Sequence, residues 1–324
     1  MHYLSPLSRG LFHRGFTISS VVTNSGMLTL IPLQKAKLLA ERVKCEERSV
    51  EAMVRCLRKK PIEDLVNANI WFKPAVETGN PNAFLPENPY KMLKDKNVYN
   101  VPWIASNVIN ESLFSLESVY RNRSEIFSIY NNWTEWGKRF LDLQDYVDAD
   151  KLEYTLNKIK EFYLDDTEIT AENGLQKLNK LLTDRHFLVG TDLAIRTQAA
   201  ATRSSVYFYL FKFVPEDNLQ FFGPPAASHG VDDKLMFKFS TNPRRLQPQG
   251  EKMMRLFIEF LAKFAKTGVP RIGSTNWYPI NPRQSNLKVL EINSPEDIKM
   301  RSMKELAPRR FWDSLPIKEN NHLF

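Results

Sequence analysis

A histidine in a turn of small residues is the clearest candidate for proton-transfer chemistry in this sequence. His229 lies within the segment Pro224–Asp233, where alanine, serine and glycine surround it, and the carboxylates of Asp232 and Asp233 follow it closely. Small residues allow a backbone and a substrate to approach each other, and a histidine with a pKa near neutrality can take up and return a proton. The alternative is an ordinary loop histidine, and this segment by itself does not decide between the two.

The carboxylate of Glu111 is the second candidate, because it follows an apolar stretch directly. The residues from Val101 to Ile109 have the pattern of a buried strand, and a polar turn from Asn110 to Ser112 comes after them. The ends of sheet strands are where α/β folds usually carry their chemistry. The alternative for Glu111 is a solvated loop acid.

The motifs of several common catalytic classes are absent from the sequence. No two glycines stand four positions apart, so there is no Gly-x-Ser-x-Gly nucleophile elbow, and there is no Gly-Gly pair. The chain also lacks a phosphate-binding P-loop, a dinucleotide-binding glycine fingerprint and a His-Glu-x-x-His motif. Its five histidines and two cysteines are not grouped at metal-ligand spacing. We therefore expect no metal and no cofactor.

The hydrophobic pattern predicts an α/β fold, which would place both side chains at strand ends. Apolar residues at helical spacing in residues 4–12 precede a strand-like run at 15–23, as if the chain entered a sheet midway. The apolar run 206–214 indicates a buried central strand. The clearest helix is predicted at 250–266, with Gly268 as its stop. The pattern further indicates helices at 34–44, 49–58, 61–67 and 309–315, a strand at 287–292, loops over 68–100, mostly helix over 113–202 and a loose tail at 317–324.

Composition and charge argue against several classes of protein. The 324 residues are 43% hydrophobic and 25% charged, which fits one large or two ordinary globular domains. The formal net charge is +8, but the basic residues are scattered, so we expect no nucleic-acid partner. No apolar run approaches the roughly 20 residues that span a bilayer, so we expect no transmembrane segment. Residues 1–16 lack the apolar core of a signal peptide.

The two cysteines, Cys45 and Cys56, lie in a segment of helical period in which Ser49 is the expected N-cap. A disulfide that closes a short loop and two buried free thiols both fit this spacing, and a disulfide would indicate an oxidising compartment. Glycosylation sequons also point to secretion, although such triplets are common by chance, and they begin at Asn110, Asn122 and Asn132.

Several segments in a fixed order carry a resemblance to a known family. They are Tyr3–Arg14, Cys45 with Cys56, Phe72–Glu77, Val101–Ser112, Ser228–Asp233, and Phe264–Gly268 with Pro270, Trp277 and Pro279. Through them, about residues 2–316 resemble the type-B carboxylesterase and cholinesterase family of α/β-hydrolases, and insect esterases in particular. The resemblance implies an α/β-hydrolase fold, a central sheet flanked by helices, that is incomplete at its N-terminal side. It would occupy residues 1–316 and leave 317–324 as a tail.

The resemblance implies a serine esterase with a Ser-His-Glu triad. His229 would take the proton of the serine as general base and return it to the leaving alcohol, while Glu111 would hold the imidazole in the right tautomer and stabilise its cation. The resemblance also implies a disulfide between Cys45 and Cys56, a small lipophilic ester as substrate and a secreted parent protein. It does not indicate the oligomeric state. Glycosylation is expected at Asn122 and Asn132.

Two residues depart from the family's pattern near the expected site. Val231 looks like an extra residue between His229 and the acidic pair, and an insertion there would tilt the turn. Ser112 stands where the family usually has glycine after the acid, and a Cβ is hard to accommodate there if φ is positive. Both departures concern the geometry of the site and not the fold.

The expected nucleophile lies outside this sequence. The match begins with Tyr3–Arg14, which resembles the segment after the family's serine elbow, so the serine, the oxyanion loop and the first strands would precede Met1. We therefore expect a fragment that is inactive by itself, because loss of the serine costs on the order of 10⁶ in turnover in a comparable triad. The alternatives are a non-catalytic cholinesterase-like adhesion or binding protein, which would need neither side chain, and a non-functional product.

Overall fold

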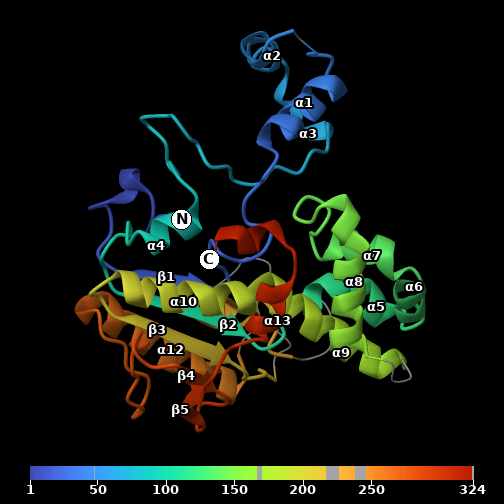
Figure 1. The fold of residues 1–324 in the computed structure, drawn as a ribbon. Coiled ribbons are helices and arrows are strands. Elements are labelled where there is room, and N and C mark those ends of the chain that lie inside the picture. The colour runs from blue at the N-terminus through green and yellow to red at the C-terminus, as the bar shows by residue number, and fades with distance from the viewer. Residues whose placement is uncertain (47, 166–169, 217–225, 238–245, 323–324) are drawn as a thin grey trace. The chain divides into compact units, whose positions relative to one another are not determined.

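A five-stranded sheet forms the centre of the larger of two compact units in the computed structural model, which describes residues 1–46, 48–165, 170–216, 226–237 and 246–322 (Figure 1). The strand order is β1-β2-β3-β4-β5; the first four strands run parallel, and β5 runs antiparallel to β4. Parallel neighbours need crossover connections, which here contain helices. The predicted α/β class is therefore confirmed. The strands are β1 (Gly15–Ile18), β2 (Trp103–Val108), β3 (Val206–Phe211), β4 (Leu287–Ile292) and β5 (Ile298–Met303).

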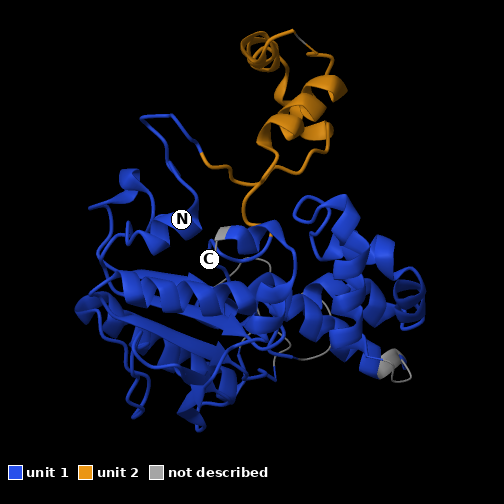
Figure 2. Ribbon diagram, in the orientation of Figure 1, with its two compact units in different colours: residues 1–25, 77–324 blue, residues 26–76 orange. Residues whose placement is uncertain are grey.

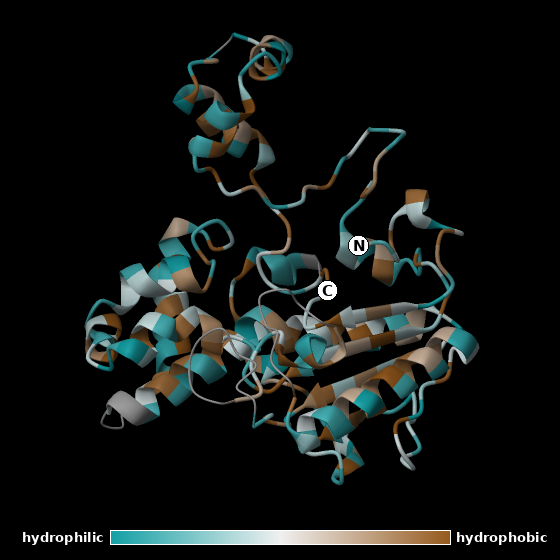
Figure 3. Cartoon of the chain, turned by 180° about the vertical axis from the view of Figure 1, so that it is seen from behind, coloured by the Kyte–Doolittle hydropathy of each residue, from teal (hydrophilic) through white to brown (hydrophobic). Residues whose placement is uncertain are grey.

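The neighbouring strands β2 and β3 are buried along their whole length, as strands covered on both faces are. Figure 3 colours the chain by hydropathy, residue by residue. Successive side chains of a strand point to opposite faces of the sheet. In β3, Tyr207, Tyr209 and Phe211 therefore belong to one core cluster, and Phe208 and Leu210 belong to another. The alternation gives the sheet two separate apolar faces, and each one needs a helix to cover it.

Two helices cover these faces. The helix α12 (Pro248–Thr267) buries Phe257 and Phe260 against Tyr209, with ring centroids 5.7 and 6.2 Å from the tyrosine ring. It ends where Gly268 adopts φ 75°, as its sequence predicts. The opposite face packs against α10 (Val189–Ala201), which contributes small alanine side chains and Ile195. No helix in the described part of the chain is long and apolar enough to cross a membrane.

A helical region is inserted between β2 and β3 and has a core of its own. Trp133, Tyr146 and Leu156 are buried in it, together with Trp312 from near the C-terminus. Its elements are η2 (Leu113–Leu116), α5 (Glu117–Arg121), α6 (Glu125–Asn131), α7 (Trp133–Phe140), α8 (Ala149–Leu164), α9 (Ala171–Thr183) and the π-helical turn η3 (Asp184–Leu188).

The C-terminal segment is ordered against this region, so the expectation of a loose tail is wrong for residues 317–322. Ile317 is buried, and Arg185 Nη1 lies 2.8 Å from Glu319 Oε2. The side chain of Asn320 donates to backbone carbonyls, including that of Trp312 at 2.8 Å. The segment forms η4 (Lys318–His322) after α13 (Arg309–Ser314).

Short elements account for most of the other differences from the sequence-based expectation. The expected helix in residues 4–12 is reduced to the 3-10 turn η1 (Pro6–Ser8), because Pro6 lacks an N–H donor and Gly10 adopts φ 82°. The strand expected at 15–23 ends at Ile18. The half-exposed strand β5 was not predicted, although its first four residues alternate between apolar and polar. Two short helices, α4 (Pro89–Lys94) and α11 (Val231–Met236), were also missed.

Residues 26–76 form the second, smaller unit (Figure 2). It contains α1 (Pro32–Arg42), α2 (Val50–Leu57) and α3 (Ile62–Asn67), close to their predicted bounds. The hydroxyl of Ser49 accepts a hydrogen bond from Ala52 N at 3.2 Å, so Ser49 is the N-cap of α2. Cys45 and Cys56 are joined by a disulfide. This bond excludes the alternative of two free thiols. Both cysteines belong to the small apolar core of the unit.

Candidate functional site

The structure brings Glu111 and His229 together although 118 positions separate them in the chain. Glu111 Oε2 lies 2.7 Å from His229 Nδ1. The carboxylate is completely buried, whereas the histidine side chain keeps 41% of its surface exposed. Glu111 follows β2 and His229 lies in the segment after β3, so both come from the carboxyl ends of neighbouring parallel strands.

The backbone fixes the two turns against each other. Asn110 and Ser228, which directly precede the two site residues, form a parallel bridge. Within it, Asn110 N donates to the carbonyl of Ala227 at 3.1 Å. The positions of the acid and the histidine therefore depend on main-chain hydrogen bonds and not only on the contact between their side chains.

The second carboxylate oxygen of Glu111 is held by donors from its own strand. Oε1 accepts from Asn107 Nδ2 at 2.8 Å and from Val108 N at 2.9 Å. Asn107 Nδ2 also lies 3.1 Å from the carbonyl of Ser19, just after β1. Two donors hold Oε1, and an ionised carboxylate only accepts hydrogen bonds, so His229 Nδ1 carries the proton in its contact with Oε2. This tautomer leaves the lone pair of the imidazole on Nε2, the nitrogen that can act as a base.

Nearby carboxylates increase the affinity of His229 for a proton. Burial acts to lower the pKa of His229, but the hydrogen bond to Glu111 and the charge of Glu111 outweigh it and raise the pKa above its ordinary value. The charges of Asp232 and Asp233 act in the same direction. Asp232 is itself fully buried, and burial raises its pKa to about 7 although Tyr209 donates a hydrogen bond to it at 2.7 Å.

The two departures from the family's pattern are accommodated without strain. Gly230 takes the left-handed conformation with φ 80° before α11 begins, and Val231 is fully buried as the first residue of that helix. Ser112 has φ −95°, so its Cβ meets no backbone penalty. The turn therefore still delivers His229 to Glu111.

Two aromatic rings flank the imidazole of His229. The ring of Phe114 lies 5.3 Å from it and that of Phe187 lies 5.5 Å from it, measured between centroids. Phe114 is 48% exposed. Sequence reasoning found neither ring, because apolar side chains at such positions look the same as core. It also missed Asn107, for which a signal was available: an asparagine inside an otherwise apolar strand needs partners.

The other residues singled out in the sequence make no recorded contact with Glu111 or His229. Asn122 and Asn132 are exposed on the helical region, so their side chains are accessible, and glycosylation there stays a prediction. The disulfide lies in the unit of residues 26–76. Among the described residues, no group of three or more metal-ligating side chains comes together.

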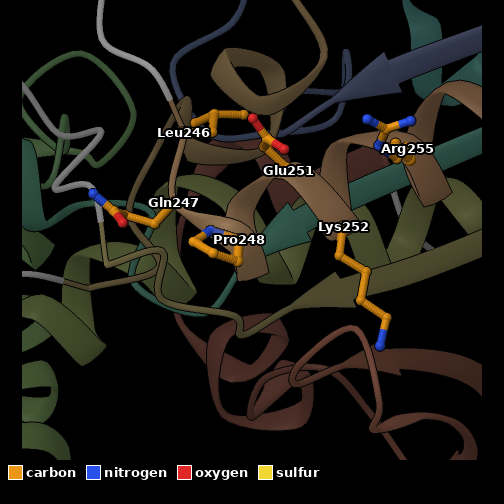
Figure 4. A pocket seen from close by; sticks show the side chains of 6 residues that line it. All are labelled: Leu246, Gln247, Pro248, Glu251, Lys252 and Arg255. Carbon is orange, nitrogen blue, oxygen red and sulfur yellow. The ribbon is translucent and has the colours of Figure 1, made fainter.

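One surface cavity of the larger unit is lined by residues other than the acid–histidine pair. A surface hollow of about 610 Å³ opens at the start of α12 (Figure 4), and its lining residues are Leu246, Gln247, Pro248, Glu251, Lys252 and Arg255. Cavity volume and side-chain chemistry thus point to different places. We place the candidate site at Glu111 and His229, because within the described part of the chain this is where a fixed acceptor and a polarised imidazole meet.

Comparison with known proteins was made against protein families and curated proteins. A model of the Carboxylesterase family matches residues 1–312. Venom carboxylesterase-6 of Apis mellifera is 29% identical to the chain, and the alignment covers 98% of this chain and 60% of that protein. Esterase FE4 of Myzus persicae is 26% identical over 96% of this chain and 58% of its own length. Cocaine esterase of Homo sapiens is 27% identical over 82% of this chain and 47% of its own length.

The chain thus spans about 60% of the length of the curated relative from Apis mellifera. The family match, in contrast, extends over nearly all of the chain, and it agrees with the α/β sheet and with the disulfide inferred from the resemblance. The protein belongs to the carboxylesterase family of α/β-hydrolases.

Proposed function

We propose that this chain supplies the acid and the histidine of a carboxylic ester hydrolase. The observation that carries the proposal is the 2.7 Å contact between Glu111 Oε2 and His229 Nδ1 at the carboxyl ends of neighbouring strands. A base whose second nitrogen is held by a buried carboxylate is the arrangement that activates a hydroxyl nucleophile. An adhesion protein would have no use for this arrangement.

In the proposed reaction, His229 Nε2 removes the proton from a nucleophilic hydroxyl as its oxygen attacks the ester carbonyl. The resulting imidazolium is stabilised by Glu111, and it gives the same proton to the leaving alcohol when the carbon–oxygen bond breaks. Water then hydrolyses the acyl intermediate by the same two proton transfers. His229 is unchanged at the end of each cycle.

The nucleophile itself is not assigned to any residue of this sequence. The 324 residues contain no Gly-x-Ser-x-Gly segment, so we propose that these residues alone do not hydrolyse esters at a rate that depends on His229. In a comparable triad, loss of the serine lowers turnover on the order of 10⁶-fold.

The proposed substrates are small lipophilic carboxylic esters. Support comes from Phe114 and Phe187, whose rings lie beside His229 and would contact an apolar acyl or alcohol group. We also propose a secreted glycoprotein. The disulfide between Cys45 and Cys56 supports this location, because such bonds persist in oxidising compartments.

A first experiment tests whether the chain works without a nucleophile. The 324-residue protein and its His229→Ala variant are compared for hydrolysis of a short-chain aryl ester. We expect the two rates to be equal. A rate that disappears in His229→Ala would show that a nucleophile is present in the chain after all.

A second experiment tests the acid and the histidine directly. This chain replaces the matching part of Apis mellifera venom carboxylesterase-6, so that the remainder of that protein supplies the nucleophile. We expect ester hydrolysis that falls by several orders of magnitude in His229→Ala, whereas an exposed histidine elsewhere, changed in His13→Ala, has no effect. A hybrid whose activity survives His229→Ala would exclude the proposed role.

A further inference from the structure

The π-helical turn η3 (Asp184–Leu188) is tied to its surroundings by every one of its polar side chains. Asp184 Oδ2 accepts from Tyr163 Oη at 3.0 Å and from Lys180 Nζ at 2.7 Å. Arg185 pairs with Glu319 near the C-terminus. Wider turns of this kind are rare, and they interrupt α-helices frequently at functional sites.

His186 is held on both ring nitrogens by neutral groups. Its Nε2 lies 2.7 Å from the carbonyl oxygen of Phe140, and its Nδ1 lies 2.9 Å from Ser25 Oγ. A carbonyl only accepts, so Nε2 must carry the proton, and Nδ1 must accept the hydroxyl proton of Ser25. Burial, together with the charge of Arg185, lowers the pKa of His186 to about 4, so the neutral tautomer persists over the physiological range.

The residue after His186 reaches the candidate site. The ring of Phe187 lies against the imidazole of His229, 5.5 Å away between centroids. The helix that leads into η3 contacts the other half of the site: Thr183 Oγ1 accepts from Ser112 N at 3.2 Å. The segment 183–187 therefore contacts both the turn that follows Glu111 and the imidazole of His229.

We propose that His186 is a positioning residue, which anchors η3 to the Ser25 loop and to the end of α7 and thereby holds Phe187 against His229. The imidazole of His229 is about two-fifths exposed and is fixed at Nδ1 by Glu111, so one remaining freedom is rotation of its plane about that contact. The rings of Phe187 and Phe114 both lie beside the imidazole, and both restrict this rotation. This inference rests on the proposed function, since it assigns His186 to the orientation of the base.

The geometry favours His186 over the other anchors of η3. Asp184 and Arg185 connect the turn to Tyr163 and to the C-terminal segment, which lie in the helical region and its border. Only His186, among the polar residues of η3, bonds to the loop that follows β1. Because His186 directly precedes Phe187, a change in its anchoring moves the backbone that carries the phenyl ring.

The test is an NMR measurement of His229 in the 324-residue protein. The His186→Leu variant removes both hydrogen bonds and retains an apolar side chain, and Phe187→Leu removes the ring itself. We expect the His229 ring protons and its Nδ1 proton to shift in His186→Leu in the same direction as in Phe187→Leu. The variant His186→Gln, whose amide can donate to Phe140 O and accept from Ser25, should restore the wild-type positions.

The N-terminus offers a matched control. His2 Nδ1 lies 2.9 Å from Ser8 Oγ, the same serine–histidine bond in another place, so His2→Leu should leave His229 unchanged. The proposal fails if His186→Leu leaves the His229 signals at their wild-type positions, or if His186→Gln shifts them as much as His186→Leu does. If His186→Leu does not fold, Ser25→Ala removes one anchor and decides by the same criterion.

This readout is independent of ester hydrolysis. A wild-type signal in His186→Leu refutes the positioning role even if the hybrid esterase depends on His229. Conversely, an inactive hybrid would refute the proposed function without changing what the NMR measurement says of His186.

Discussion

The imidazoles of His229 and His186 lie in adjoining parts of the molecule, and their affinities for a proton move in opposite directions. His229 contacts the carboxylate of Glu111, and its pKa is raised. His186 contacts a hydroxyl and a backbone carbonyl, and its pKa is lowered to about 4. Phe187 directly follows His186 in the chain, and its ring contacts the imidazole of His229.

The partners of the two rings explain the difference: His229 has a hydrogen bond to the carboxylate of Glu111 and its negative charge beside it, whereas His186 has neutral partners and the positive charge of Arg185 nearby. Both rings lose hydration, which disfavours the imidazolium form. At His229 the hydrogen bond to Glu111 and the charge of Glu111 offset that loss, so this ring can accept a proton during a reaction, whereas His186 stays neutral and acts as a fixed connector. The same residue type thus has a chemical role at one position and a structural role at the other.

The largest effect on the difference between the pKa values of His229 and His186 is expected from Glu111→Gln. Removal of the negative charge should lower the pKa of His229 by roughly 1–3 units and leave that of His186 unchanged. In the wild type, the raised pKa means that proton binding by His229 stabilises the fold; this contribution is complete below the unfolded-state pKa and is lost as the pH rises through the folded-state pKa. Histidine titration by NMR measures both rings in one experiment, and an unshifted His229 would contradict the electrostatic explanation.

A smaller effect is expected from Asp232→Asn, because the charge of Asp232 raises the pKa of His229 less than Glu111 does. Its pKa is raised to about 7, so ionisation of this buried carboxyl opposes folding; stability is greatest below the unfolded-state value and falls as the pH rises toward 7 and beyond. Asparagine keeps an acceptor for Tyr209 without the charge. We expect a gain in melting temperature over the wild type at pH 8 that is absent at pH 4, and a slightly lower pKa of His229. A gain that does not vary with pH would count against this explanation.

Substitution of Gly190 tests the His186 side of the comparison. A Cβ at Gly190 would lie 2.5 Å from the carbonyl oxygen of Thr23, a backbone atom two residues before Ser25. Gly190→Ala should therefore cost about 1–3 kcal/mol of stability and shift the His186 signals more than those of His229. Gly137→Ala is the matched control, since its Cβ would come closest to the end of the Leu156 side chain, 2.6 Å away, and not to a backbone atom. Equal losses in thermal unfolding of the two variants would contradict the prediction.

No effect on either histidine is expected from Cys45→Ser. The disulfide closes a loop with a sequence separation of 11, and its loss should destabilise the unit of residues 26–76 by roughly 2–3 kcal/mol. Thermal unfolding should record this loss while the signals of His186 and His229 keep their positions. A shift of either ring would contradict this prediction.

The sequence predicted the elements whose patterns are local and strong. The strand β4 and the helices α2, α3 and α12 lie close to their expected bounds, because their apolar spacing and their capping residues act within a few positions. The prediction of a helix in residues 4–12 was wrong, because a short apolar spacing does not maintain a helix up to Gly10, which adopts φ 82°. The order of the C-terminal segment was missed because it depends on Arg185, 134 positions away from its partner Glu319.

At the site, the sequence by itself determined the residue types and the strand ends on which they lie. Glu111 and His229 could be selected from a polar turn after an apolar strand, from a small-residue turn and from a family resemblance. Only the tertiary structure decided that the carboxylate is buried, that Asn107 and Val108 fix its second oxygen, and that Phe187 lies beside the base. The physical reason is range: propensity and capping act between neighbours in the chain, whereas desolvation, hydrogen-bond geometry and the difference between two histidines arise from groups that only the folded sheet brings together.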